Sequence, residues 1–485
     1  MSVMLSAIFL GALDGTMVNT ALPAMSKDLL PSAADVLWIV DGYSLAIAAS
    51  LVSCATAGDR WGRKPVFLAG LGLFAGVSAI AGTTSHPVVL VCVRIVQGVA
   101  AAMIVSSVVA TIRVIFTSQR ARTLAYGLWT AALSVGLAAG PVLGGVIVQD
   151  AGWRWVFLVN VPVALVAMVL GGLWVQNSRA AAASYGGALS LILSAAGLGA
   201  VVYALQNAAG FSPVAAACAI TGAGCLAWFT RRQLRAAVPL LELRLFCSRP
   251  FALAAVSIIV SYGSYAGLLF LLSQRLQLAD GAPPLQAGLT IVPFAAAIAA
   301  GGLLSPWWAR FYGRPAGVMT GMLLQAAALA WLALVPGWLT PALVAMGLGT
   351  GIVATLAADL LMSNAPAAKA GQAGAIQETA FALGSGIGVA VLGTVAILTF
   401  RARLSGVPHA GSSLAATIDH AAALAPAARS PLLHAATSAF TTGYTVALVT
   451  AAASLTVVAT VGFATARRAA APGGDDVPDT GAPSW

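Results

Sequence analysis

The chain has 485 residues, of which 60% are hydrophobic and only 8% are charged. A soluble domain keeps about a quarter of its residues charged, so lipid must solvate most of this chain. The formal charge of +10 comes from Lys and Arg residues that lie between apolar runs. They form no contiguous basic patch, which argues against a nucleic-acid partner and for a topological role. The five cysteines and four histidines lack metal-ligand spacing, so we expect neither a metal nor another cofactor.

Apolar runs long enough to cross a bilayer, about 20 residues each, recur along the whole chain. They predict an all-α polytopic membrane protein with fourteen spans, at 3–24, 37–57, 66–85, 88–112, 123–148, 156–176, 186–206, 213–230, 251–273, 286–307, 316–335, 341–362, 372–399 and 439–464. The first run carries Asp14 in its middle and lacks a basic leader. It therefore predicts an uncleaved first helix and not a signal peptide.

The basic residues give these spans an orientation. With fourteen spans, 17 of the 24 Lys and Arg residues fall on the side of the two termini and 6 on the other, while Arg94 lies within a span. Because basic residues concentrate in cytoplasmic loops, we expect both termini to be cytoplasmic.

The connection after the second span reads Gly-Asp-Arg-Trp-Gly-Arg-Lys-Pro at residues 58–65. Its glycines permit a tight turn, and it lacks the spacing of a phosphate-binding loop. The pattern D-R-x-G-R-K at this place closely resembles the signature of the major facilitator superfamily. That signature usually opens with a glycine four residues before the aspartate, where this chain has Ala55.

Three further motifs fall where this resemblance requires them. Span 4 carries R-I-V-Q-G at residues 94–98, and span 5 carries Gly136, Gly140, Pro141, Gly144 and Gly145 in the spacing of the antiporter motif G-x-x-x-G-P-x-x-G-G. Span 1 reads L-D-G-T-M-V-N-T-A-L-P at residues 13–23, similar to the opening of fourteen-span drug/proton antiporters. Residues 153–162 and 240–246 also resemble that family, so the resemblance covers nearly the whole chain.

The resemblance implies a major facilitator fold, in which two six-helix bundles flank a cavity that opens alternately to either side. The expected divisions are 1–176 for the first bundle, 177–250 for two inserted spans and a cytoplasmic linker, and 251–466 for the second bundle. Within the second bundle, the outer segment 400–438 predicts an Ala-rich helical hairpin or lid. Residues 467–485 have a disordered composition. Repeat symmetry in this fold places the binding site near the membrane midplane between the bundles.

Four acids fall inside predicted spans: Asp14, Asp41, Asp359 and Glu378. A charge at the bilayer centre costs about 2.5–3.5 kcal/mol on insertion scales. One of the four could be paired with Arg94 to join two helices, which would be a purely structural role. The remaining acids predict groups that hold a proton or a cationic substrate. The resemblance implies proton coupling for Asp14, Arg94 and Glu378.

The expected substrate-binding residues combine carboxylates with aromatic rings. Asp41 lies in W-I-V-D-G-Y with Trp38 and Tyr43, which resembles a segment of quaternary-ammonium pumps and suits a lipophilic cation. An interfacial aromatic belt with a wetted aspartate is the alternative. Glu378 follows Gln377 in an E-T-x-x-x-L-G stretch that is similar to the same pumps.

Further residues are expected to line the cavity or to control its opening. The sequence does not fix which way Asn19, Gln97, Trp129 and Gln377 face, but Asn19 and Gln377 are included among the substrate-binding residues. Asp359 is either a gating residue or a structural one. The motifs add gating candidates at Asp59, Arg60, Gly62, Arg63, Gly136, Gly140, Pro141 and Gly144.

The resemblance implies proton-coupled efflux of lipophilic, cationic drugs or antiseptics across a bacterial plasma (inner) membrane, by a monomer that uses the proton gradient. Export of an endogenous metabolite such as an antibiotic or siderophore is the alternative, because the motifs scarcely separate the two. A proton-coupled peptide importer is a third reading, although its acid- and Arg-rich signature is missing from span 1. An enzyme would need a catalytic or metal-binding group of residues, which the sequence lacks.

Overall fold

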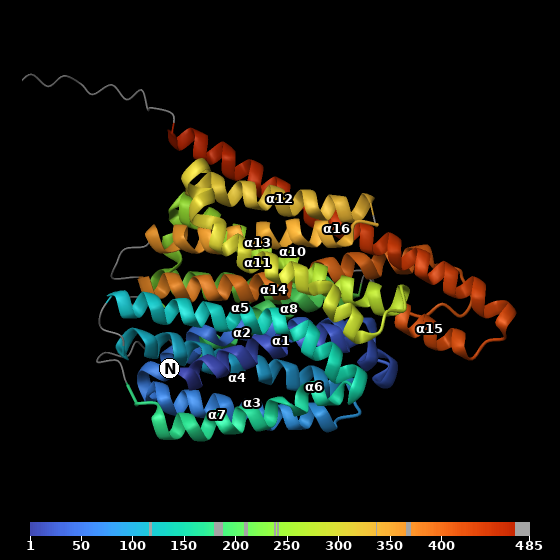
Figure 1. Ribbon diagram of the computed structural model, residues 1–485, viewed down its shortest axis with the longest axis horizontal. Helices are drawn as coiled ribbons and strands as arrows, with labels where there is room; N and C mark the ends of the chain where they lie inside the picture. Colours follow the sequence, from blue (N-terminus) through green and yellow to red (C-terminus); the bar gives the residue numbers. More distant parts are fainter. Residues whose placement is uncertain are drawn as a thin grey trace, which may run out of the picture.

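The computed structural model describes residues 1–115, 119–178, 188–207, 212–236, 239, 242–335, 337–364 and 370–470. These residues form helices and their connections, without a β-strand (Figure 1). Thirteen of the helices are long and apolar enough to cross a membrane. Helix α8 (Ala188–Gln206) contributes a shorter apolar stretch and corresponds to the seventh predicted span. The prediction of an all-helical polytopic protein is therefore confirmed. Thirteen of the fourteen predicted spans correspond to helices long enough to cross a membrane, and the seventh corresponds to the shorter α8.

The described residues up to 178 form seven helices, because one predicted span is broken in two. Their bounds are α1 Ser2–Leu29, α2 Ala33–Trp61, α3 Arg63–Thr83, α4 Pro87–Ile115, α5 Gln119–Asp150, α6 Arg154–Leu158 and α7 Asn160–Trp174. The break at Val159 has a local cause: Pro162 has no backbone N–H to donate to the carbonyl of Leu158. The prediction of one continuous span over 156–176 missed this break.

The rest of the chain follows the predicted order. The bounds are α9 Pro213–Arg235, the 3₁₀ turn η2 Leu243–Cys247, α10 Arg249–Gln274, the π-helical turn η3 Arg275–Ala279, α11 Pro284–Tyr312, α12 Arg314–Leu334, α13 Leu339–Ser363, α14 Ala370–Arg403, α15 Leu414–Ala422 and α16 Pro426–Ala470.

The last helix begins earlier and ends later than its predicted span. Helix α16 starts within segment 400–438, where it packs against α15. It also continues through residues 467–470, which the sequence assigned to a disordered tail; the rest of that tail lies outside the described residues. Helix α15 itself is amphipathic, with Leu414, Thr417 and Ala421 buried.

The helices pack in two groups with an inserted pair between them. In the first group α1 packs on α5, α2 on α4, and α3 on α4 and α7; in the second α11 and α12 pack on α13, and α10 on α14. Helices α8 and α9 pack on each other, and α8 also contacts α2 and α14. The two groups meet through the pairs α2–α14, α5–α11 and α1–α10. The long helices lie side by side in Figure 1.

The helix array has two ends, the N-terminal face and the opposite face. The N-terminal face holds Met1, the turn at Gly62 between α2 and α3, and the turn at Gly313 between α11 and α12. The opposite face holds the connection from α1 to α2 and helix α15. Between the two faces, large apolar side chains such as Val166, Leu303 and Val457 are exposed, as expected where helices contact lipid tails.

Candidate functional site

A cavity of about 190 Å³ lies between the two groups of helices. Its walls come from α1, α2, α4 and α5 on one side and from α10 and α14 on the other. The lining is mostly apolar and aromatic, with Tyr43, Trp129, Tyr262, Tyr265 and Phe381 among its residues. Among the described residues that line it, Glu378 is the one charged side chain.

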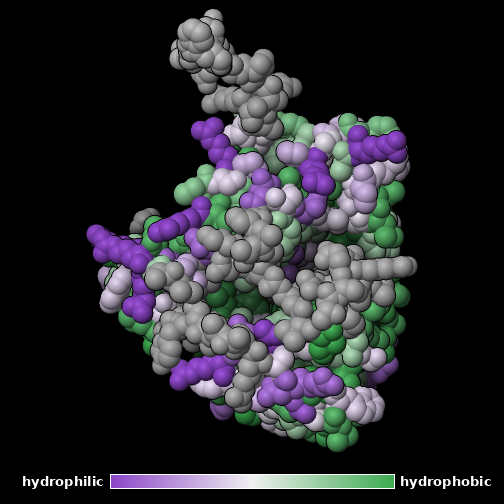
Figure 2. All heavy atoms as spheres, turned by 90° about the vertical axis from the view of Figure 1, so that its left-hand side faces the viewer, coloured by the Kyte–Doolittle hydropathy of each residue, from purple (hydrophilic) through white to green (hydrophobic). Residues whose placement is uncertain are grey.

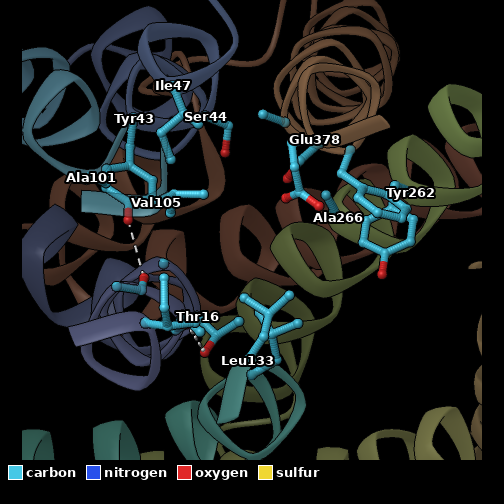
Figure 3. A pocket seen from close by; sticks show the side chains of 18 of the residues that line it. Thr16, Tyr43, Ser44, Ile47, Ala101, Val105, Leu133, Tyr262, Ala266 and Glu378 are labelled. Atoms are coloured by element: carbon cyan, nitrogen blue, oxygen red, sulfur yellow. Dashed lines mark hydrogen bonds between the residues drawn. The ribbon is translucent and has the colours of Figure 1, made fainter. Parts of the chain in front are cut away.

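Glu378 stands among aromatic rings on the second group of helices. Figure 3 shows it beside Tyr262 and across the cavity from Tyr43 and Thr16. The Tyr262 ring lies 4.4 Å from the ring of Phe381 and 5.7 Å from that of Tyr265, between ring centroids. A carboxylate beside aromatic faces attracts an organic cation by charge and by cation–π contact. Among the described residues of the lining there is no Lys or Arg that could neutralise this carboxylate.

The cavity is closed toward the opposite face. There the Cβ position of Gly393 on α14 meets Leu37 on α2, and that of Gly145 on α5 meets the carbonyl of Pro284 on α11. Lining residues extend toward the other end, through Ala7 on α1 and Leu51 on α2. Figure 2 shows a hollow in the N-terminal face with hydrophobic residues inside it. The structure is therefore in a conformation that opens toward the N-terminal face.

Asp14 and Arg94 form an ion pair buried beside this cavity. Arg94 Nη1 donates to Asp14 Oδ2 at 2.6 Å, and the exposed fractions of the two side chains are 1% and 0%. Arg94 also donates to Gln97 Oε1 at 2.8 Å and, through Nε, to the carbonyl of Ile39 at 3.0 Å. The sequence had one arginine for four acids inside spans, and the structure assigns it to Asp14.

Tyr43 separates the ion pair from the cavity. Its ring lies 4.3 Å from the Arg94 guanidinium carbon, and it also lines the cavity. Its hydroxyl donates to the carbonyl of Gly11 at 3.1 Å, a bond drawn in Figure 3. A movement of α1 or α2 that displaced Tyr43 would connect Asp14 with the cavity.

Asn160 completes the partners of Asp14, and sequence reasoning did not select it. Its Nδ2 donates to Asp14 Oδ1 at 2.6 Å, while Gln97 Nε2 lies 3.2 Å from the same oxygen and 3.0 Å from Ser78 Oγ. Asn160 is fully buried and begins α7, directly after the break at Val159. In the sequence, the signal that could have selected Asn160 is a side-chain amide two residues before a proline within an apolar run.

Asp41 lies outside the described lining of the cavity, although the sequence placed it in the binding site. It is fully buried and accepts a hydrogen bond from Gln206 Nε2 of α8 at 2.8 Å. Trp38 is also outside the lining and packs with Leu45 and Val202. In this conformation the W-I-V-D-G-Y segment therefore divides: Tyr43 faces the cavity, whereas Asp41 faces the inserted helix α8.

Of the two other predicted binding residues, one lines the cavity and one does not. Asn19 lines the cavity and its side-chain Oδ1 is buried without a hydrogen-bond partner, which leaves an acceptor at the cavity wall. Gln377 is half-buried and is not part of the lining, although it precedes Glu378 directly.

The glycines of α5 serve two different contacts. Gly136, Gly140 and Gly144 face α1, where a Cβ would meet Phe9, Thr16 and Met17 respectively. Gly145 instead faces Pro284 of α11, and the Cβ position of Gly288 on α11 meets the carbonyl of Pro141 in return. Pro141 and Gly145 thus lie at the contact between the two groups, while the other three glycines join α5 to α1.

The loop at 58–65 anchors the N-terminal face of the first group. Arg63 pairs with Asp59 at 2.9 Å and donates to the carbonyl of Ala110 on α4 at 3.0 Å. Gly62 has a φ of 105°, a left-handed conformation that favours glycine. Arg60 is exposed.

Asp359 has a partner in the equivalent place of the second group. It pairs with Arg314, at the start of α12, at 2.8 Å, and both side chains are about half exposed. An ion pair between α12 and α13 fits the structural role of Asp359 as well as a gating role.

Comparison with known proteins is consistent with this geometry. A sequence model of the Major Facilitator Superfamily matches residues 4–389. The multidrug efflux pump LfrA of Mycolicibacterium smegmatis is 36% identical over 480 residues, covering 96% of this chain and 95% of that protein. The tetracenomycin C resistance and export protein of Streptomyces glaucescens is 33% identical, covering 94% and 89%. The methyl viologen resistance protein SmvA of Salmonella typhimurium is 32% identical, covering 92% and 94%.

Solved structures share the fold. A bacterial homolog of the human lysosomal transporter Spinster, in an inward-facing and occupied conformation, superimposes with a TM-score of 0.70 at 14% identity, covering 96% of both chains. The nucleoside transporter NupG gives a TM-score of 0.61 at 11% identity, covering 95% of this chain and 98% of that one. With a family match over most of its length and relatives above 30% identity, the chain belongs to the major facilitator superfamily of membrane transporters.

Proposed function

We propose that this transporter exports lipophilic monovalent cations from bacterial cells in exchange for protons. The observation that carries the proposal is the carboxylate of Glu378, the one charged group among the described residues that line a mostly apolar and aromatic cavity. The names of its relatives, which are multidrug efflux pumps and resistance proteins, support drug efflux. Both termini are proposed to lie in the cytoplasm, so that the N-terminal face is the side from which substrate enters.

The exchange follows from what one carboxylate can bind. A proton on Glu378 removes the negative charge that attracts an organic cation, so the two ligands compete for the same group. Export then requires that a proton reach Glu378 when the cavity opens outward and leave it when the cavity opens inward. A gradient of 100 mV supplies about 2.3 kcal/mol per elementary charge.

Asp14 and Arg94 are proposed as the second proton-handling group. Three donors surround the Asp14 carboxylate, one each from Arg94, Gln97 and Asn160. Any movement that withdraws Arg94 or Asn160 makes the negative charge costlier and favours a proton on Asp14. Tyr43 contacts both the ion pair and the cavity, so it is the proposed link between substrate binding and this movement.

Transport by the purified protein in proteoliposomes with an imposed pH gradient tests the proposal. We expect wild-type protein to move a monovalent cationic dye, Glu378→Gln to abolish this movement, and Asp14→Asn to impair it strongly. Because Asp41 lies outside the cavity lining, Asp41→Asn should retain dye binding. Asp150 is an exposed acid at the end of α5, so Asp150→Asn is the matched control and should transport normally. Movement of neutral compounds but never of cationic dyes would reject the cation assignment.

A second candidate is export of a specific metabolite, because one relative is named a tetracenomycin C resistance and export protein. The two candidates differ in their breadth. Several unrelated cations should compete with the dye for a polyspecific pump, whereas a dedicated exporter would respond to one chemical family.

A further inference from the structure

Pro23 leaves one backbone carbonyl of α1 without its helical partner. It lies inside α1, six residues before the helix ends at Leu29. A proline has no N–H to donate to the carbonyl four residues earlier, which here belongs to Asn19. Inside a membrane an unsatisfied carbonyl is costly, and a neighbouring helix commonly supplies the missing donor.

The donor comes from the other group of helices. Ser273 Oγ, on α10, donates to the Asn19 carbonyl at 2.6 Å, and the Ser273 side chain is 1% exposed. Gln277, in the π-helical turn η3, donates to the carbonyl of Thr20 at 2.9 Å and to Ser273 Oγ at 3.1 Å. These bonds join the two groups of helices directly, on the side of the cavity toward the opposite face.

We propose that Ser273 and Gln277 are gating residues that hold the opposite face closed by binding the carbonyls of α1 next to Pro23. The proposal rests on the alternating access of the proposed function, because the bond from Ser273 to Asn19 breaks when the two groups separate at this face. A contact made in one state alone shifts the equilibrium toward that state. Pro23 is the element that makes the Asn19 carbonyl available.

The bond can also be released at small cost. A serine hydroxyl in a helix can donate to the carbonyl four residues earlier in its own helix. Ser264 of α10 does so, donating to the Val260 carbonyl at 2.8 Å. When the face opens, Ser273 can turn to the carbonyl of Leu269, and water that enters can solvate the Asn19 carbonyl.

Spin-label distances across the opposite face test the proposal. In full-length protein with its five cysteines replaced by serine, labels are placed at Ser85→Cys and Thr340→Cys, exposed positions at that face in the two groups. A neutral hydrogen bond contributes about 0.5–1.5 kcal/mol, so Ser273→Ala should raise the population with a long label distance about two- to tenfold. Ser264→Ala, in the same helix but bonded within it, should match the wild type.

Pro23→Ala distinguishes the proposed role from a general weakening of the fold. Alanine restores an N–H that competes for the Asn19 carbonyl, so this variant should shift the distances in the same direction as Ser273→Ala. The double variant should shift them no further than the larger single effect. A wild-type distribution in Ser273→Ala, or effects of Pro23→Ala and Ser273→Ala that add in full, would overturn the proposal. Dye transport is measured separately: its absence in the wild type would reject the proposed function and leave the distance result standing.

Discussion

Arg94 lies inside a bundle of apolar helices, and its hydrogen-bond partners among the described residues are all acceptors. Its donors reach a carboxylate, an amide oxygen and a backbone carbonyl, and its guanidinium lies over Tyr43. Removing one partner of a buried ion pair costs about 3–5 kcal/mol, because the other charge remains unpaired. Asp14 and Arg94 therefore act as a unit. Replacing one of them alone either destabilises the fold or requires that a proton compensate the remaining charge.

Asn160 offers a cleaner test of this polar cluster than either charge. Asn160→Leu removes the donor to Asp14 Oδ1 while keeping a side chain of similar size. We expect a loss of about 1–3 kcal/mol in stability, since a charged acceptor loses a hydrogen bond, together with impaired proton-driven dye export. Thermal unfolding of the detergent-purified protein measures the first effect.

The matched control is Asn207→Leu. Asn207 is also an asparagine at a helix end, but it is only half-buried and donates to the backbone carbonyl of Tyr203 in the preceding helix turn. Its replacement should change stability by less than about 0.5 kcal/mol. Equal unfolding temperatures for the two variants would contradict the importance of Asn160 to the buried cluster.

At the scale of elements, α5 contacts two neighbours through glycines of different registers. Gly136, Gly140 and Gly144 recur every four residues and allow α1 to approach closely, as small residues do in membrane helices. Gly145 is one position further round the helix, about 100° away, and it faces α11. The single motif therefore serves both the packing of the first group and its contact with the second.

Substitution by alanine separates these two contacts. A Cβ at Gly145 would lie 2.7 Å from the carbonyl of Pro284, so Gly145→Ala should push α5 from α11 and favour opening of the opposite face. Gly136→Ala, whose Cβ would lie 2.7 Å from the carbonyl of Phe9, should instead lower stability. The distance between spin labels at residues 85 and 340 reports the first effect, and thermal unfolding reports the second.

Gly76 supplies the control, since a Cβ there meets nothing within 4 Å. Gly76→Ala should leave the label distances unchanged and, by restricting the unfolded chain, stabilise the protein by about 0.4–1 kcal/mol. If Gly145→Ala and Gly76→Ala gave the same distance distribution, Gly145 would have no part in closing the face.

At the scale of the whole molecule, the uneven distribution of Lys and Arg predicts which face meets the cytoplasm. Cys247 is exposed in the turn η2 before α10, on the side of the N-terminal face, and Thr340 is exposed at the opposite face. In cells that carry Cys92→Ser, Cys218→Ser and Cys225→Ser, a membrane-impermeant maleimide should label Thr340→Cys and spare Cys247. Inside-out vesicles should show the reverse pattern. Labelling of Cys247 in intact cells would contradict the proposed orientation.

Much of the fold could be predicted because a membrane leaves few choices. Backbone groups in lipid must be satisfied within a segment, so each long apolar run becomes a helix, and each predicted span overlaps a helix of the structure. The predicted ends of the spans differ most from the helix ends where no charged residue or glycine marks the end of an apolar run. Helix α16 extends well before residue 439, because the Ala-rich segment that precedes it has high helix propensity.

The sequence by itself determined the helical class, the order of the spans and the acids that lie within them, together with the motifs that identify the superfamily. Only the tertiary structure decided which way each residue faces: Asp14 to Arg94 and Asn160, Asp41 to Gln206, and Glu378 to the cavity. The physical reason is that a membrane helix is apolar on all sides, so its sequence carries no amphipathic pattern to mark the inner face. Packing against neighbouring helices sets that direction, and with it which carboxylate a substrate can reach.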